Sequence, residues 1–216
     1  MIGAFTWEGG TVSGAWHKPE GPATAALILG HGAGYNMNTR LLMDIGDALA
    51  ARGVAVLRFN FPYTEAGRRA PDRQPTLEAC YRSVATAVAE EFPLPFLGGK
   101  SMGGRIASHI VADGFPAAGL VFLGYPLHPP GKPERIRDSH LGRIVVPMLF
   151  LQGTRDPFAT PELLHRTIRN HKMARLVEIE GGDHSFKVRD RADREVTAEL
   201  IEAVVSFIFE AVGERH

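Results

Sequence analysis

The chain has 216 residues, of which 44% are hydrophobic and 22% charged, a composition that is typical of a folded domain and excludes a disordered chain. Lysine plus arginine and aspartate plus glutamate both number 24, so a net charge of zero gives no overall attraction to nucleic acid or to an anionic membrane. Cys80 is the only cysteine, which excludes an internal disulfide. We therefore expect a single domain over residues 1–216.

The N-terminal segment shows no targeting signal. Residues 1–8 contain neither a basic start nor a long apolar run, so they do not resemble a secretory signal peptide. All apolar stretches are shorter than the ~20 residues that a helix needs to span a bilayer. We expect a cytoplasmic protein with no nucleic-acid partner and no membrane partner.

Strand and helix patterns alternate along the chain. Gly9-Gly10 is a hairpin signal between the first two predicted strands. Strands are expected at 2–7, 11–16, 25–29, 54–57, 94–97, 120–123, 147–151 and 176–180, and helices at 41–49, 77–88, 103–112, from 160 onward and at 196–208. This alternation favours an α/β fold, with a mostly parallel twisted sheet and helices on both faces. The one sizeable irregular stretch, residues 126–146, is too short for a cap domain.

A serine lies where one predicted strand meets a predicted helix. Gly99-Lys100-Ser101-Met102-Gly103 matches the pattern G-x-S-x-G. A serine at such a sharp turn has a strained backbone and close neighbours, which glycines on either side accommodate. The turn lifts the hydroxyl above the sheet, at a helix N-terminus that favours negative charge. We predict that Ser101 is a nucleophile.

The same residues contain Gly-Lys-Ser, which also ends the phosphate-binding loop of many nucleotide-binding proteins. That loop needs a glycine five residues before its second glycine, and the sequence has Leu94 there, in an apolar run. A nucleotide-binding protein is therefore the weaker alternative, which thermal stabilisation by nucleotide would reveal. Lys100 is left without an assigned role.

A serine nucleophile needs a base and an acid that orients the base. Where the serine sits on such a strand-to-helix turn, the acid and then the histidine follow it in chain order. Asp156 follows the strand at 147–151, and His184 follows the strand that ends at 180. All three residues thus lie just past the carboxyl ends of strands, the edge where parallel sheets place ligand sites. We predict that Asp156 orients His184, the base for Ser101.

Two other residues compete for these roles. Asp183 is adjacent to His184 in the chain, and adjacent side chains usually point apart. His128 could be the base, but it precedes the expected acid in the sequence. We prefer Asp156 over Asp183 and His184 over His128.

Two backbone N–H groups are needed to bind the oxyanion of the reaction. One should come from Met102, the residue after the nucleophile. The other should come from His31-Gly32-Ala33-Gly34, the glycine-rich loop after the strand at 25–29. We predict that Ala33 is the second donor, with Gly34 as the alternative.

These segments carry a family resemblance. Together with Arg58-Phe59-Asn60-Phe61-Pro62, Gly153-Thr154-Arg155-Asp156-Pro157 and Gly182-Asp183-His184-Ser185-Phe186, they make the chain similar to α/β-hydrolases, and to the compact, cap-less branch that resembles dienelactone hydrolase. The resemblance implies a triad of Ser101, Asp156 and His184, with no metal and no cofactor. Dienelactone hydrolases themselves use cysteine as nucleophile, so Ser101 argues against dienelactone as the substrate.

The function expected from these residues is that of a serine esterase. It would cleave an ester, thioester or small amide through an acyl-enzyme intermediate. With no cap over the site, we expect short acyl esters to be preferred to long-chain lipids. The alternative is a binding or interaction module that reuses the fold without catalysis, which labelling by a serine-directed reagent would distinguish.

Overall fold

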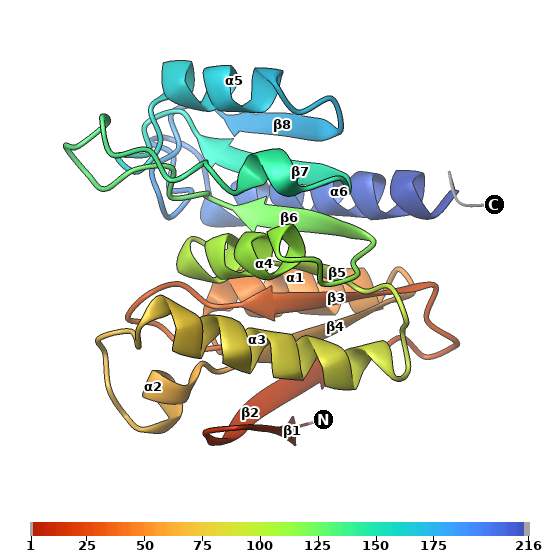
Figure 1. Ribbon diagram of the computed structural model, residues 1–216. Helices are drawn as coiled ribbons and strands as arrows, with labels where there is room; N and C mark the ends of the chain where they lie inside the picture. The colour runs from red at the N-terminus through yellow and green to blue at the C-terminus, as the bar shows by residue number, and fades with distance from the viewer. Residues whose placement is uncertain (1, 214–216) are drawn as a thin grey trace.

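The computed structural model describes residues 2–213, which form one sheet of eight strands with helices on both faces (Figure 1). The expected domain at 1–216 also includes residues 1 and 214–216, which lie outside the described residues. The strands are β1 Ile2–Trp7, β2 Gly10–His17, β3 Ala25–Gly30, β4 Val54–Phe59, β5 Phe96–Lys100, β6 Gly119–Leu123, β7 Met148–Gly153 and β8 Ala174–Ile179. The helices are α1 Arg40–Ala50, α2 Pro62–Glu65, α3 Gln74–Ala89, α4 Met102–Ala112, α5 Pro161–Arg169 and α6 Asp193–Gly213, with a 3₁₀ turn at Leu141–Arg143.

The strand order in the sheet is β1-β2-β4-β3-β5-β6-β7-β8. The hairpin β1–β2 pairs antiparallel within itself and with β4, whereas β3 to β8 are all parallel. The carboxyl ends of the parallel strands therefore meet along one edge, on the left in Figure 1. The predicted fold class is confirmed: the sheet is mostly parallel, and no cap domain is inserted between residues 2 and 213.

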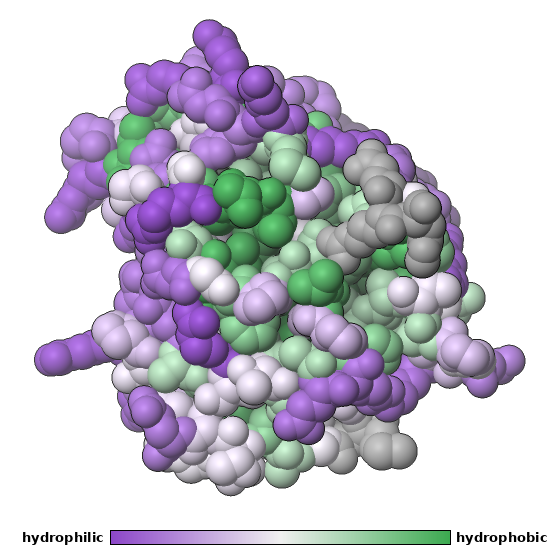
Figure 2. Space-filling view, turned by 45° about the vertical axis from the view of Figure 1, so that its right-hand side comes forward, coloured by the Kyte–Doolittle hydropathy of each residue, from purple (hydrophilic) through white to green (hydrophobic). Residues whose placement is uncertain are grey.

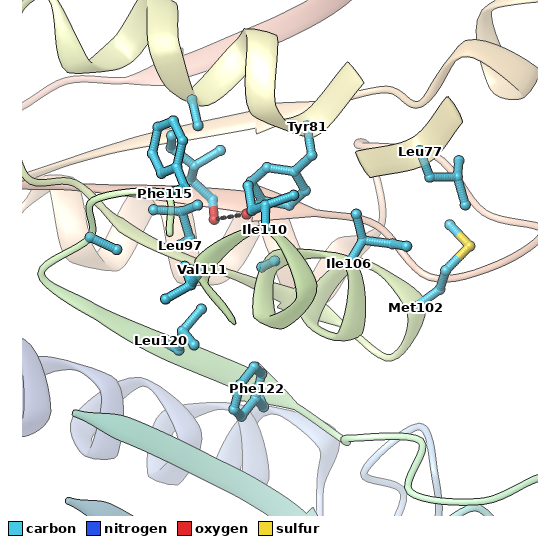
Figure 3. Close-up of a cluster of buried hydrophobic side chains, with 14 of the residues drawn as sticks. Leu77, Tyr81, Leu97, Met102, Ile106, Ile110, Val111, Phe115, Leu120 and Phe122 are labelled. Carbon is cyan, nitrogen blue, oxygen red and sulfur yellow. Dashed lines mark hydrogen bonds between the residues drawn. The ribbon is translucent and has the colours of Figure 1, made fainter. Parts of the chain in front are cut away.

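Two apolar layers cover the sheet. Helices α3 and α4 lie side by side on one face, and α1 and α6 lie on the other (Figure 1). Figure 3 shows the first layer, where Leu77 and Tyr81 of α3 meet Ile106 and Ile110 of α4. The Tyr81 hydroxyl donates to the carbonyl of Ile28 and accepts from the N–H of Gly98, so this buried polar group ties α3 to two strands. Burial from both faces explains why the strands read as continuous apolar runs.

One predicted strand was misplaced. The apolar run at 94–97 indicated a strand there, but Leu94 is exposed and β5 runs from Phe96 through two glycines to Lys100. Glycine usually weakens a strand, yet a Cβ on Gly98 would lie 2.1 Å from the carbonyl oxygen of Val121. The ladder needs glycine at this position because β6 approaches so closely. The strand consequently delivers the chain directly to Ser101.

The other predicted elements agree with the structure to within a few residues. Helix α2, with four residues beginning at Pro62, had no counterpart in the sequence prediction, because one turn is too short to show a period. Thr160 directly precedes α5, and its side chain makes no capping hydrogen bond. The irregular stretch 126–146 contains only the 3₁₀ turn.

Figure 2 brings forward the end of the sheet opposite to the carboxyl ends of the parallel strands. Hydrophilic residues gather around the rim of this face, and hydrophobic residues gather toward its middle. Exposed apolar side chains precede three strands of the sheet, Leu94 before β5, Val145 before β7 and Met173 before β8. Among residues 2–213, no helix is long and apolar enough to cross a membrane.

Candidate active site

Ser101 occupies a strained turn between β5 and α4. Its φ is +49° and its ψ −110°, a conformation that residues with a side chain rarely adopt. Two hydrogen bonds fix this turn: the Ser101 N–H donates to the carbonyl of Leu123 at 3.1 Å, and the Arg105 N–H donates to the carbonyl of Ser101 at 3.1 Å. Because the neighbouring β6 and the first turn of α4 both hold the backbone, the hydroxyl is presented in one direction.

The flanking glycines allow α4 to pack directly on β3. A Cβ on Gly99 or on Gly103 would lie 2.2 Å from the carbonyl oxygen of Gly30 in each case. Gly99 also has a φ of +150°, which disfavours any side chain. The spacing G-x-S-x-G is therefore a steric requirement of this turn.

The three predicted side chains form a continuous chain of hydrogen bonds. His184 Nε2 lies 2.9 Å from Ser101 Oγ, and His184 Nδ1 lies 2.6 Å from Asp156 Oδ2. The residues come from the loops after β5, β7 and β8, which meet at the carboxyl edge of the sheet. The Asp156 side chain is fully buried, while 21% of the His184 side chain is exposed. This geometry allows the imidazole to exchange a proton with the serine while the carboxylate holds the ring.

The Asp156 carboxylate is anchored by two further donors. Its Oδ1 accepts the Phe158 N–H at 2.8 Å, and its Oδ2 also accepts the Gln152 amide at 2.6 Å. Gln152 is buried at the end of β7, and its own oxygen accepts the Tyr125 N–H at 2.8 Å. The ring of Phe158 lies against the imidazole of His184, with centroids 4.3 Å apart.

Sequence reasoning did not assign Gln152 or Phe158 to the site. The one available signal was the polar Gln152 at the end of the apolar run 148–151, four residues before the predicted acid. An amide in that position is equally consistent with the end of a strand. Its contact with Asp156 arises only because the turn after β7 folds back on the strand.

The rival acid and base have other partners. Asp183 Oδ1 accepts the N–H groups of Ser185 and Lys187 at 2.7 and 2.9 Å, which closes the turn that carries His184. His128 Nδ1 lies 2.9 Å from the carbonyl of Pro129, and its Nε2 accepts the Thr160 N–H at 3.1 Å. The structure brings neither side chain into the hydrogen-bond chain with Ser101.

The loop after β3 lies opposite the serine. His31 at its start is buried, and burial lowers its pKa to about 4. A neutral ring suits its contacts, since His31 Nε2 accepts the Phe61 N–H at 3.1 Å and Nδ1 lies 2.9 Å from the carbonyl of Gly32. The Gly34 N–H donates to the Tyr63 hydroxyl at 3.3 Å. Of the two predicted donors in this loop, Gly34 therefore already has an acceptor.

Met102 and Ala33, the predicted oxyanion donors, both lie near the serine. Met102 is the first residue of α4, and its side chain points toward Leu77 of α3 (Figure 3), so the start of the helix is anchored in the core. Ala33 lines a pocket together with Ser101. The N–H groups of helix N-termini favour negative charge, which suits an oxyanion at this place.

A pocket of about 330 Å³ opens beside the serine and the histidine. Its lining is mostly apolar and comes from the loop after β3, the start of α1, the turn at Ser101 and the loops after β7 and β8. The lining residues are Gly32, Ala33, Tyr35, Thr39, Leu41, Lys100, Ser101, Phe158, His184 and Ser185. Such a pocket fits a small apolar group, with the serine hydroxyl at its wall.

The sequence matches the family model described as "Alpha/beta hydrolase domain" over residues 23–212, most of the chain. The chain belongs to the alpha/beta hydrolase family. The prediction of an α/β-hydrolase-fold enzyme is thus confirmed at the level of the family. The family membership leaves the substrate open, because members with one fold differ in the groups that line the site.

Solved structures of other proteins are similar to this one over nearly their whole length. An alpha-beta serine hydrolase homologue from Coxiella burnetii is 20% identical, with a TM-score of 0.77 over 95% of this chain and 96% of that one. A lidless α/β serine hydrolase from Xanthomonas campestris is 20% identical, with a TM-score of 0.75 over 96% of this chain and 94% of that one. Est1E from Butyrivibrio proteoclasticus, in a structure with bound ferulic acid, is 17% identical, with a TM-score of 0.76 over 98% and 99%.

Proposed function

We propose that this alpha/beta hydrolase cleaves an ester, thioester or small amide through an acyl-enzyme intermediate on Ser101. The observation that carries the proposal is the hydrogen-bond chain from Ser101 Oγ through His184 to Asp156, with distances of 2.9 and 2.6 Å. A nucleophile, a base and a group that orients the base within hydrogen-bond reach are what acyl transfer requires.

In the first half of the reaction, Ser101 Oγ attacks the carbonyl carbon of the substrate. His184 Nε2 takes the hydroxyl proton as the new C–O bond forms, and it then gives that proton to the leaving group as the bond to the leaving group breaks. Asp156 accepts the Nδ1–H throughout, which keeps the Nε2 nitrogen directed at the serine and stabilises the transient imidazolium.

The second half releases the acid. His184 removes a proton from a water molecule, which attacks the acyl carbon, and the same proton returns to Ser101 Oγ when the acyl–serine bond breaks. In both halves the carbonyl oxygen becomes negative. We assign its stabilisation to the N–H groups of Met102 and Ala33, because Gly34 is engaged by Tyr63.

The pocket supports a small apolar acyl group as the specificity element. Its volume of about 330 Å³ is at the lower end of ligand sites, and no inserted cap enlarges it among the described residues. Tyr35 and Phe158 supply aromatic surface on its lining. Est1E, a structural neighbour, was solved with ferulic acid bound, so aromatic acyl esters belong in the substrate panel beside short aliphatic ones.

A fluorophosphonate probe tests the proposal. The reagent should phosphonylate the purified protein once, and mass spectrometry should place the adduct on Ser101. The internal control is Ser108, which also contacts a histidine, with 2.7 Å between Ser108 Oγ and His140 Nε2, but which is buried and donates to the carbonyl of Arg105. Ser101→Ala should abolish labelling, and Ser108→Ala should preserve it. A folded protein that does not react at Ser101 is a binding module instead.

A further inference from the structure

Lys100, the residue before the nucleophile, carries a buried amine that no hydrogen bond accounts for. Its Nζ is inaccessible to solvent, and none of the residues 2–213 provides it with a hydrogen-bond acceptor. The amine lies over the face of the Phe186 ring, whose centroid is 5.4 Å away. A buried, unpaired ammonium is costly in a folded protein, so its position calls for a functional explanation.

The amine lies next to the hydrogen-bonded pair Asp156–His184. It lies beside Gly124, which follows β6 with a φ of +71°. A Cβ added to Gly124 would lie 2.9 Å from Lys100 Nζ, 3.5 Å from His184 Nδ1 and 3.6 Å from Asp156 Oδ2. The amine, the imidazole and the carboxylate therefore converge on the space that the missing side chain of Gly124 leaves open.

The charge of Lys100 at neutral pH follows from two opposed effects. Burial disfavours the ammonium and lowers its pKa, while the carboxylates of Asp156 and Asp183 favour the ammonium and raise its pKa. Burial is the larger effect, so the pKa of Lys100 is lowered to about 8. At pH 7 the amine is therefore mostly protonated. Because water is excluded around it, its field is screened far less than that of a surface lysine.

A bound anion does not explain this residue. The side chain contributes to the pocket lining, but its Nζ is enclosed beneath Phe186, and solvent does not reach it. A carboxylate or phosphate in the pocket would contact the stem of the lysine and not its charge. The groups within the reach of the charge belong to the catalytic machinery itself.

We propose that Lys100 is a positioning residue of the active site: a buried cation behind Asp156 and His184 that keeps the Asp156 carboxylate ionised and disfavours a second positive charge on the resting imidazole. The inference rests on the proposed function, since it concerns the base of that reaction. Its consequence is that removing the charge of Lys100 should change the pH dependence of the reaction.

Other charged groups near this site are exposed. Lys187 lies on the turn that carries His184, and Arg155 precedes the acid, and both are in contact with solvent. Beyond Phe186, a surface hollow is lined by Arg40 and Asp44 of α1, which form an ion pair with each other. Their fields are screened by water and ions. Among residues 2–213, the buried charges that face the imidazole are thus those of Asp156 and Lys100, and Asp183 acts on the lysine from the turn.

The test compares the pH dependence of kcat/KM in Lys100→Met and Lys187→Met. Both changes remove one lysine, but the first removes a buried charge and the second removes an exposed charge on the turn that carries His184. Methionine fills the volume of the stem without a charge. We expect the acid limb of the Lys100→Met profile to move to higher pH by about one unit, and that of Lys187→Met to coincide with the wild type. Lys100→Gln should shift in the same direction as Lys100→Met.

The rate of inactivation by a fluorophosphonate, measured over the same pH range, provides a second readout that needs only the serine and its base. The inference is overturned if the acid limbs of Lys100→Met and Lys100→Gln coincide with that of the wild type. The proposed function would survive that result, because the wild type would still react at Ser101. The inference also fails if neither neutral variant folds, because Lys100 is then a structural residue. If the wild type does not react at any pH, it is the proposed function that fails.

Discussion

Gln152 donates a hydrogen bond to the same carboxylate oxygen of Asp156 that accepts the Nδ1–H of His184, and both distances are 2.6 Å. The two donors approach Oδ2 from β7 and from the loop after β8. The Gln152 amide thereby fixes the orientation of the Asp156 carboxylate relative to the imidazole. Gln152 is in turn fixed by the Tyr125 N–H, so the orientation of the base is tied to the frame of the sheet.

Replacing this amide should therefore impair turnover more than folding. In Gln152→Met the carboxylate loses one of its donors and can rotate, and a small misplacement of catalytic groups costs up to about 10²-fold in rate. The unpaired Tyr125 N–H should lower stability by about 1–3 kcal/mol. Steady-state kinetics on an activated ester, with urea denaturation, measures both. Gln74→Met is the control, because its side chain contacts Glu78 and Arg105 and not the site; equal losses in both variants would contradict the role.

The two aspartates near the histidine should differ sharply. In Asp156→Asn the new amide would favour the wrong imidazole tautomer, and in the best-studied triad this change lowers turnover by about 10⁴-fold. Asp183 accepts two backbone N–H groups of its own turn, so Asp183→Asn should lose less than about tenfold, or ~1.4 kcal/mol. Kinetics of both variants, with folding checked by circular dichroism, decides between them. A crippled Asp183→Asn with a nearly normal Asp156→Asn would show that the acid is misassigned.

The sequence supported the order and the place of these residues for a physical reason. The turn at Ser101 is formed by residues that are adjacent in the chain, so a local pattern reveals it. The carboxyl ends of parallel strands meet at one edge of the sheet, so side chains just past these ends are neighbours. The structure accordingly brings Ser101, Asp156 and His184 together. The start of β5 was misjudged because the glycines that form the strand read as the beginning of a loop.

The residues around this chain of hydrogen bonds could not be predicted in the same way. Gln152 contacts Asp156 because the turn after β7 folds back on the strand. Phe158 and Lys100 approach His184 from the ends of other strands, and no local spacing in the sequence encodes such contacts. Lys100 in particular looks like an ordinary charged residue in the pattern. The role proposed for Lys100 depends on the space beside Gly124, where its amine comes close to the acid and the base. That space exists only in the folded sheet.

Gly124 offers a test of that space. Gly124→Ala should lower activity, because the new methyl carbon would lie 2.9 Å from Lys100 Nζ and would displace this amine from the acid and the base. Gly131→Ala is a matched control: its φ of +67° resembles the +71° of Gly124, but no atom lies within 4 Å of its added Cβ. Both variants should lose roughly 1 kcal/mol of stability from the left-handed backbone. If both variants lose the same activity, the loss in Gly124→Ala comes from backbone strain and not from the contact with Lys100.

Acid should destabilise the protein through its buried histidines. Burial lowers the pKa of His31 to about 4 and that of His140 to about 3. Between these values and about 6.5, the ordinary pKa of histidine, the unfolded chain binds more protons than the folded one. Stability is thus fully present above pH 6.5 and falls as the pH drops, by about 1.4 kcal/mol per pH unit for each such histidine.

Urea denaturation at several pH values between about 7.5 and 5 measures this slope. His140→Gln keeps a side-chain nitrogen near Ser108, the partner of His140 Nε2 at 2.7 Å, but it does not titrate in this range. Its free energy of unfolding should therefore vary less with pH than that of the wild type. A wild-type stability that stays constant down to pH 5 would contradict the assignment of neutral, buried rings.

The size of the pocket predicts a limit to the acyl chain. Each buried CH₂ contributes ~0.8 kcal/mol, so kcat/KM should rise about fourfold per carbon while the chain enters a volume of about 330 Å³. Beyond about eight carbons the chain must leave the pocket, and the specificity constant should level off or fall. Leu41→Phe, which narrows the lining, should move the optimum to shorter esters, and Met43→Phe, on the exposed side of α1, should not. A specificity constant that keeps rising with chain length would mean that a larger apolar surface binds the substrate.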